Sequence, residues 1–120
     1  MARFGLLLTC NGFANQNLAS VMLFARAALN KGHEIDHLFL YQDAVYSVAA
    51  HTDLPADEPD LASELAQFCQ QHAIALLFCI TAAEKRGVVS DIRPARAGYI
   101  AAGLAEFAMR QVNIDKLVQF

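Results

Sequence analysis

The chain has 120 residues, of which 56% are hydrophobic, and a formal net charge of −3 at pH 7. This length is typical of one domain with a sizeable core, so we expect a single domain over residues 1–120, and the high apolar content predicts that part of its surface contacts other subunits. The slightly acidic balance, without blocks of like charge, argues against direct binding to a nucleic-acid backbone.

The first half of the chain alternates strand and helix patterns. Residues 4–9 are a short apolar run that predicts a buried strand, followed by the polar loop 11–17. Apolar side chains recur at helical spacing over 18–29. A second strand is predicted over 33–41, and the loop 42–46 lies past its carboxyl end. This half therefore begins with a strand–helix–strand unit.

The second half continues the alternation after an irregular connection at residues 49–60, which contains two prolines. The predicted elements are a helix over 61–72, a strand over 74–79, a short helix over 81–86 stopped by Gly87, a basic loop over 90–96, a helix over 99–111 and a strand over 116–120. Strands alternating with helices at this spacing predict an α/β fold: a three-layer α/β/α sandwich around an open, mainly parallel sheet of about five strands.

Neither a membrane segment nor a disulfide framework is predicted. No apolar run approaches the roughly 18 residues of a spanning helix, and the run near the N-terminus is too short and too soon interrupted for a signal peptide. The three cysteines include no C-x-x-C pair, which fits reduced thiols. We therefore expect a cytoplasmic protein that does not bind membranes.

Cys79 ends an apolar run and stands at a predicted strand-to-helix turn. The first N–H groups of a helix are unpaired, and the helix dipole at that end favours the thiolate, which is the reactive form of cysteine. In an open parallel sheet, ligands and chemistry gather beyond the carboxyl ends of the strands. Cysteine is also among the most buried residue types, so an inert core thiol is the alternative. Cys69, within the predicted helix over 61–72, fits that second description.

A resemblance to a known family favours the reactive thiol. Cys79 is followed by Ala82-Ala83, by the basic pair Lys85-Arg86 and by Gly87-Val88-Val89. Further matching segments occur in the same order along the chain: 4–9, 31–35, 39–46, 103–104 and 117–120. Together they resemble the DsrE/TusD family of small sulfurtransferase subunits over essentially the whole chain. Between Val89 and Gly98 the chain is shorter than expected of that family, which puts the expected partner surfaces in question.

The resemblance implies that Cys79 carries a persulfide in a sulfur relay, without a metal or an organic cofactor. The implied pathway is formation of 2-thiouridine at the tRNA wobble position, with sulfur oxidation of the DsrE type as the alternative. The implied partners are a TusA-like donor, a TusE/DsrC-like acceptor and TusB-like and TusC-like subunits in a hetero-oligomer, or a homo-oligomer when isolated. A third alternative is a structural paralogue without catalysis.

Other residues are candidates through their expected position beside Cys79. Cys10 ends the first predicted strand, where that family more often has a small residue such as Gly, and it is either a second, resolving thiol or packing. Polar loop residues are candidates to stabilise a persulfide anion, although each type is also common in turns. These are Asn11, Asn15, Gln16, Tyr41, Asp43 and Tyr46. Lys85, Arg86, Arg93 and Arg96 are candidates to contact an acidic carrier protein, although Lys85 and Arg86 also suit the C-terminus of a helix.

Metal and nucleotide sites are poorly supported. The four histidines, His33, His37, His51 and His72, match no metal-binding spacing. The first loop contains neither a Walker pattern nor G-x-G-x-x-G, so nothing beyond fold analogy points to a bound nucleotide or flavin.

Overall fold

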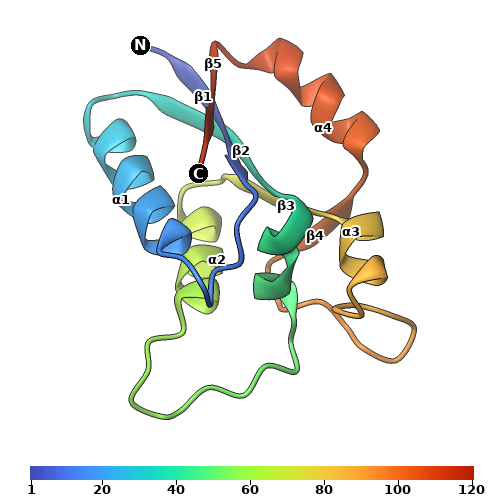
Figure 1. The fold of residues 1–120 in the computed structure, drawn as a ribbon. Helices are drawn as coiled ribbons and strands as arrows, with labels where there is room; N and C mark the ends of the chain where they lie inside the picture. Colours follow the sequence, from blue (N-terminus) through green and yellow to red (C-terminus); the bar gives the residue numbers. More distant parts are fainter.

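The computed structural model describes residues 1–120 as five parallel strands with helices on both faces (Figure 1). The strands are β1 (Arg3–Leu8), β2 (Glu34–Leu40), β3 (Ala75–Cys79), β4 (Ile100–Ala102) and β5 (Lys116–Gln119). The helices are α1 (Asn17–Asn30), α2 (Leu61–Gln71), α3 (Ile80–Lys85) and α4 (Leu104–Arg110), with 3-10 helices η1 (Gln42–Val48) and η2 (Gln111–Asn113). No helix is long and apolar enough to cross a membrane. The strand order β4-β3-β2-β1-β5 confirms the expected α/β/α sandwich around an open parallel sheet.

The two faces of the sheet are covered unequally. α1 and α2 pack side by side on one face, against β2 and β3. α4 crosses the other face, where its Phe107 ring stacks on Phe39 with 4.6 Å between ring centroids. Successive residues of a strand point to opposite faces, so Leu38 and Leu40 fill the layer under α1 and α2 while Phe39 faces α4. All three β2 side chains are at most 1% exposed, so the core lies on both sides of β2.

The predicted helix over residues 99–111 is wrong in its first part. Residues Ile100–Ala102 form β4, whose last residue lies beside Cys79 in the parallel register. The spacing of Ile100 and Leu104 imitates one face of a helix, but these side chains are 59% and 47% exposed. A strand of three residues is too short to show the alternation by which strands are recognised. β4 is therefore the one strand of the sheet that the sequence did not predict, and α4 is shorter than expected.

The other predicted strands and helices agree with the structure to within a few residues. The predicted loop over 42–46 is more regular than expected, because it forms the 3-10 helix η1. η1 buries Ala44, Val45 and Val48 at no more than 1% exposure. The segment after β2 is thus part of the core and not a free loop.

Arg96 connects the loop after α3 to the rest of the molecule. Its Nε donates to the carbonyl oxygen of Ser47 at 3.2 Å and its Nη2 to that of Ala49 at 3.0 Å. Its Nη1 lies 3.2 Å from Oδ2 of Asp60, the N-cap of α2, which also accepts a hydrogen bond from the Ser63 N–H. Burial opposes ionisation of Asp60, but the hydrogen bonds from Ser63 and the Arg96 charge outweigh it and lower the pKa of Asp60 below its usual 3.8.

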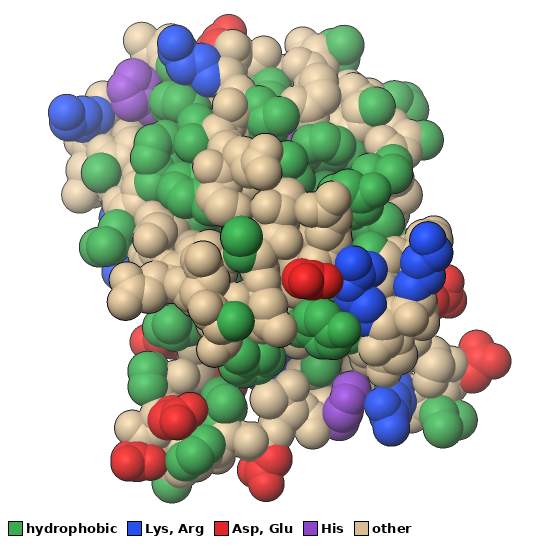
Figure 2. Space-filling model, viewed as in Figure 1, with side chains coloured by type: hydrophobic (Ala, Val, Ile, Leu, Met, Phe, Trp, Pro, Cys, Tyr) green, Lys and Arg blue, Asp and Glu red, His purple; other side chains and the backbone are tan.

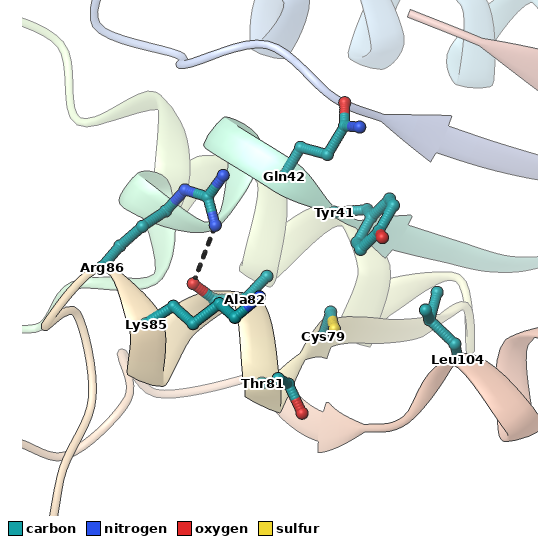
Figure 3. Close-up of a pocket in the computed structure, with 8 residues that line it drawn as sticks. All are labelled: Tyr41, Gln42, Cys79, Thr81, Ala82, Lys85, Arg86 and Leu104. Carbon is teal, nitrogen blue, oxygen red and sulfur yellow. Dashed lines mark hydrogen bonds between the residues drawn. The ribbon is translucent and has the colours of Figure 1, made fainter.

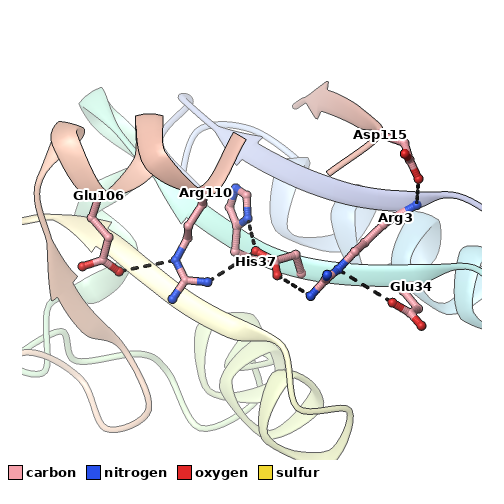
Figure 4. Close-up of polar contacts among 7 residues, drawn as sticks. Arg3, Glu34, His37, Glu106, Arg110 and Asp115 are labelled. Carbon is pink, nitrogen blue, oxygen red and sulfur yellow. Dashed lines mark hydrogen bonds and ion pairs between the residues drawn. The ribbon is translucent and has the colours of Figure 1, made fainter. Parts of the chain in front are cut away.

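An ionic cluster lies between the sheet and α4 (Figure 4). A bulge in β2 lets Asp36 and His37 both face α4. Asp36, with its side chain 8% exposed, lies 2.8 Å from Nη2 of Arg3, 3.3 Å from Nη1 of Arg110 and 2.8 Å from Nδ1 of His37. Burial opposes ionisation of Asp36, but His37 and the two guanidinium groups outweigh it and hold its pKa below 3.8. The cluster joins β1, β2 and α4.

Candidate functional site

Cys79 lies in a pocket of about 370 Å³ at the carboxyl ends of β2 and β3. The lining residues come from η1 and its N-cap, from β3, from α3 and its C-cap, and from α4: Tyr41, Gln42, Cys79, Thr81, Ala82, Lys85, Arg86 and Leu104. In Figure 3, Tyr41 and Leu104 lie to one side of Cys79, and Lys85 and Arg86 lie to the other. The pocket is therefore apolar on one side and cationic on the other.

The parallel sheet places Cys79 at this edge. It is the last residue of β3 and the N-cap of α3, with extended backbone angles (φ −71°, ψ 112°). β2 on one side and Ala102 of β4 on the other enclose it, and Cys79 is only 3% exposed. The expected strand-to-helix turn is confirmed. α3 has six residues, less than two turns, so its dipole contribution at Cys79 is smaller than that of a long helix.

The two basic residues of the pocket differ in their partners. Arg86 Nε lies 2.9 Å from Oδ1 of Asp43, and Arg86 Nη1 donates to the carbonyl oxygen of Ala82 at 3.1 Å. Lys85 takes part in no ion pair, and the hydroxyl of Tyr41 has no hydrogen-bond partner within the chain. The side-chain hydrogen-bond donors of this pocket without a partner in the chain thus include the Lys85 ammonium group and the Tyr41 hydroxyl, together with the side chains of Gln42 and Thr81.

Several predicted site residues lie away from this pocket. Cys10 follows β1, which β2 separates from β3, and its carbonyl oxygen accepts a hydrogen bond from Asn17 at 2.7 Å. The Asn11 side chain accepts from the Phe13 N–H at 2.9 Å, a local turn contact. Tyr46 is partly buried and packs against the hydrophobic core. Asn15 and Gln16 are exposed and do not line the pocket.

The basic loop after α3 also makes internal contacts. Arg93 Nη1 donates to the carbonyl oxygen of Gly87 at 3.3 Å. The side chain of Arg96 is 13% exposed, and all three of its guanidinium nitrogens have partners within the chain. The structure thus gives Arg96 a role in holding the fold together, and leaves Lys85 as the exposed cation closest to the predicted site.

Four pocket residues were not predicted as site residues: Gln42, Thr81, Ala82 and Leu104. Thr81 and Ala82 could have been found, because residues two and three positions after an N-cap line the first turn of the helix. Gln42 has a positive φ of 52°, which its residue type does not announce. Leu104 enters the pocket only because β4 pairs with β3, and that pairing was missed.

The third cysteine lies in different surroundings. Cys69, on α2, is 2% exposed, and burial raises its pKa from 9.0 to about 12. The hollow beside it is lined mainly by apolar residues and contains no charged side chain. The prediction that Cys69 belongs to the core is confirmed. Histidine, cysteine and acidic side chains form no group of three that could hold a metal ion.

Residues 2–120 match the sequence model of the DsrE/DsrF-like family. The chain belongs to this family. A Sulfurtransferase TusD from Erwinia tasmaniensis is 35% identical over 127 aligned positions, which cover 98% of this chain and 99% of the relative. A Sulfurtransferase TusD from Salmonella paratyphi B is 31% identical with the same coverage.

The alignments with these two DsrE/DsrF-like relatives are longer than the chain, so the chain lacks residues that the relatives have. The expected shortening between Val89 and Gly98 stays a prediction. Among solved structures, the ychN protein from E. coli has a TM-score of 0.79 at 19% identity over the whole of both chains. The MTH1491 protein of Methanobacterium thermoautotrophicum has a TM-score of 0.66 at 13% identity. Both share the fold of this chain.

Proposed function

We propose that this chain is a sulfurtransferase subunit that carries sulfane sulfur as a persulfide on Cys79. The observation that carries the proposal is the place of this thiol. Cys79 ends a central strand and lines a partly cationic pocket, in a chain whose relatives are named sulfurtransferases. Chemistry in open parallel sheets gathers at this edge.

The reaction needs only thiol exchange. The Cys79 thiolate attacks the outer sulfur of a donor persulfide, the donor's S–S bond breaks, and the donor leaves as a thiolate. An acceptor thiolate then attacks the outer sulfur held on Cys79, and Cys79 leaves as a thiolate with the electron pair of the broken bond. No net oxidation occurs, so no redox cofactor is required.

The pocket suits an anionic outer sulfur. The Lys85 ammonium group and the Tyr41 hydroxyl are donors without partners inside the chain, and donors aimed at developing charge stabilise it most where water is excluded. The 3% exposure of Cys79 would shield the persulfide from bulk thiols. The acceptor must then bring its own thiol into the pocket.

The proposed pathway is 2-thiouridine formation at the tRNA wobble position in the cytoplasm. The name of the relatives supports this pathway over sulfur oxidation of the DsrE type. We propose a TusA-like donor and a TusE/DsrC-like acceptor, with TusB-like and TusC-like subunits completing a hetero-oligomer. The slightly acidic chain, at net charge −3, would act on tRNA only through these partners.

Exposed apolar side chains support assembly with other subunits. α4 has no buried residue, and large apolar side chains remain exposed along the segment from β4 to β5. They are Ile100, Leu104, Met109, Val112 and Leu117. Figure 2 shows hydrophobic side chains gathered over α4. Apolar surface of this kind on a small domain commonly marks an interface.

Deletion of the gene in its host, with 2-thiouridine in total tRNA measured by nucleoside mass spectrometry, tests the proposed function. We expect 2-thiouridine to fall on deletion, to return with the wild-type gene and to stay low with Cys79→Ser. Unchanged 2-thiouridine together with loss of sulfur oxidation would support the DsrE-type alternative. Full restoration by Cys79→Ser would support a structural paralogue.

A further inference from the structure

One ion pair joins η1 and α3, two of the elements that line the mouth of the Cys79 pocket. Arg86, just after α3, places its Nε 2.9 Å from Oδ1 of Asp43 in the first turn of η1. Its Nη1 donates to the carbonyl oxygen of Ala82, one turn back in α3, at 3.1 Å (Figure 3). The second contact fixes the orientation of the guanidinium group. The ion pair therefore joins two walls of the pocket at a defined separation.

The walls need this connection because each is a short element. η1 begins at Gln42, whose φ of 52° is a left-handed conformation that is strained for a non-glycine residue. α3 has six residues, and Gly87, with φ 68°, turns the chain directly after Arg86. Val45 of η1 and Ala83 of α3 are fully buried and anchor these two elements in the hydrophobic core. The ion pair adds a side-chain link between these two packed elements at their exposed end, where the Asp43 side chain is 60% exposed.

We propose that Asp43 and Arg86 are positioning residues that set the width of this mouth and so decide which sulfur-bearing groups reach Cys79. That the groups reaching Cys79 are sulfur compounds rests on the proposed function. The accessibility of the Cys79 thiol itself can be measured with any reagent that modifies thiols. Cys79 is 3% exposed, so the route to its Sγ runs through the pocket. The sequence predicted Asp43 as a candidate to stabilise a persulfide anion and Arg86 as a candidate to contact a carrier protein; in the structure the two side chains bind each other.

Alkylation of Cys79 by two uncharged reagents of different size tests the proposal. Iodoacetamide is the small reagent and a pyrenyl maleimide the bulky one, and peptide mass spectrometry separates Cys79 from the other thiols. In Asp43→Asn and in Arg86→Gln, we expect the rate of alkylation by the bulky reagent to rise roughly two- to fivefold relative to the rate with the small reagent. This is the factor by which loss of an exposed ion pair typically changes an equilibrium constant. The double variant should match the single ones, since either substitution already breaks the pair.

Salt offers the same test without mutation. Raising the ionic strength to about 1 M shortens the screening length to roughly 3 Å, so the bulky rate on the wild type should move toward that of the variants. A rate ratio that is independent of salt contradicts the proposal. If Arg86→Gln fails to fold because its contact with Ala82 is lost, Asp43→Asn and the salt series still decide.

Glu106→Gln is the matched control. Glu106 pairs with Arg110 on α4 at 3.4 Å, and side-chain exposures of 48% and 29% resemble the 60% and 26% of Asp43 and Arg86. We expect no change in the reagent ratio for this variant. The proposal is overturned if Glu106→Gln has the same effect, if both reagents speed up equally, or if neither changes. Persulfide loading of the wild type is measured in parallel, so failure of the proposed function is seen separately.

Discussion

Cys69 and Cys79 are almost equally buried, at 2% and 3% exposure, yet they lie in opposite chemical surroundings. Cys69 sits on α2 beside a hollow without charged residues, and desolvation alone raises its pKa. Cys79 sits at the carboxyl edge of the sheet, in a pocket that also holds Lys85 and Arg86. Burial therefore does not separate a core thiol from a candidate carrier. The side chains on the open side of the sulfur do.

The largest expected difference between the two thiols is in their alkylation rates. With a pKa of about 12, only about one Cys69 thiol in 10,000 is ionised at pH 8, and the thiolate is the nucleophile. We expect iodoacetamide to modify Cys79 at least roughly 100-fold faster than Cys69 in the folded protein. A time course followed by peptide mass spectrometry measures both rates. Equal rates would contradict the expectation that Cys79 is the more reactive of the two thiols.

Alkaline pH should destabilise the fold through the Cys69 region. Burial raises the pKa of Cys69 from 9.0 to about 12, and burial also raises the pKa of Tyr99 above its usual 10.0. The unfolded chain ionises first, so these groups contribute fully to stability below pH 9, and stability falls as the pH rises from 9 toward 12. The slope is at most about 1.4 kcal/mol per pH unit for each group. Urea unfolding between pH 8 and 11 measures it, and Cys69→Ala should flatten the curve; an unchanged slope contradicts the assignment.

Serine substitutions should separate the two sites in stability. Cys69→Ser places a hydroxyl in apolar surroundings and should lower the free energy of unfolding by about 1–3 kcal/mol. Cys79→Ser places it in a pocket with polar partners and should lower that free energy by less than about 1 kcal/mol. Urea denaturation at pH 7 compares them. The reverse order would mean that Cys79 is the better-packed core residue.

An effect smaller than that of Cys69→Ser is expected in the ionic cluster on the α4 face of the sheet. Asp36→Asn weakens the contacts with Arg3, His37 and Arg110, and we expect a loss of about 1 kcal/mol at pH 7. Because the folded pKa of Asp36 lies below 3.8, its contribution is present above that pH and is lost as the pH falls through the lowered value. Alkylation of Cys79 should not change. A faster reaction in this variant would show that the cluster also shapes the pocket.

The sequence predicted most of the fold because its buried strands are continuous apolar runs, as for residues 4–9 and 74–79. β4 was not predicted, because a strand of three residues is too short to show an alternation of apolar and polar side chains. The spacing from Ile100 to Leu104 instead looked like one face of a helix. The position of Cys79 followed from local order, since a strand end and a helix start are both visible in the residues around it. The sequence did not show that Arg86 is paired and Lys85 is not, because the partner of Arg86, Asp43, lies 43 positions away in the chain.

Intact-mass spectrometry shows whether Cys79 is the residue that carries sulfur. The wild type and the variants Cys79→Ser, Cys10→Ser and Cys69→Ser are incubated with a persulfide donor and weighed before and after reduction. We expect a reducible gain of one sulfur atom in every form except Cys79→Ser. A gain that persists in Cys79→Ser, or that appears in none of the four proteins, would contradict this expectation.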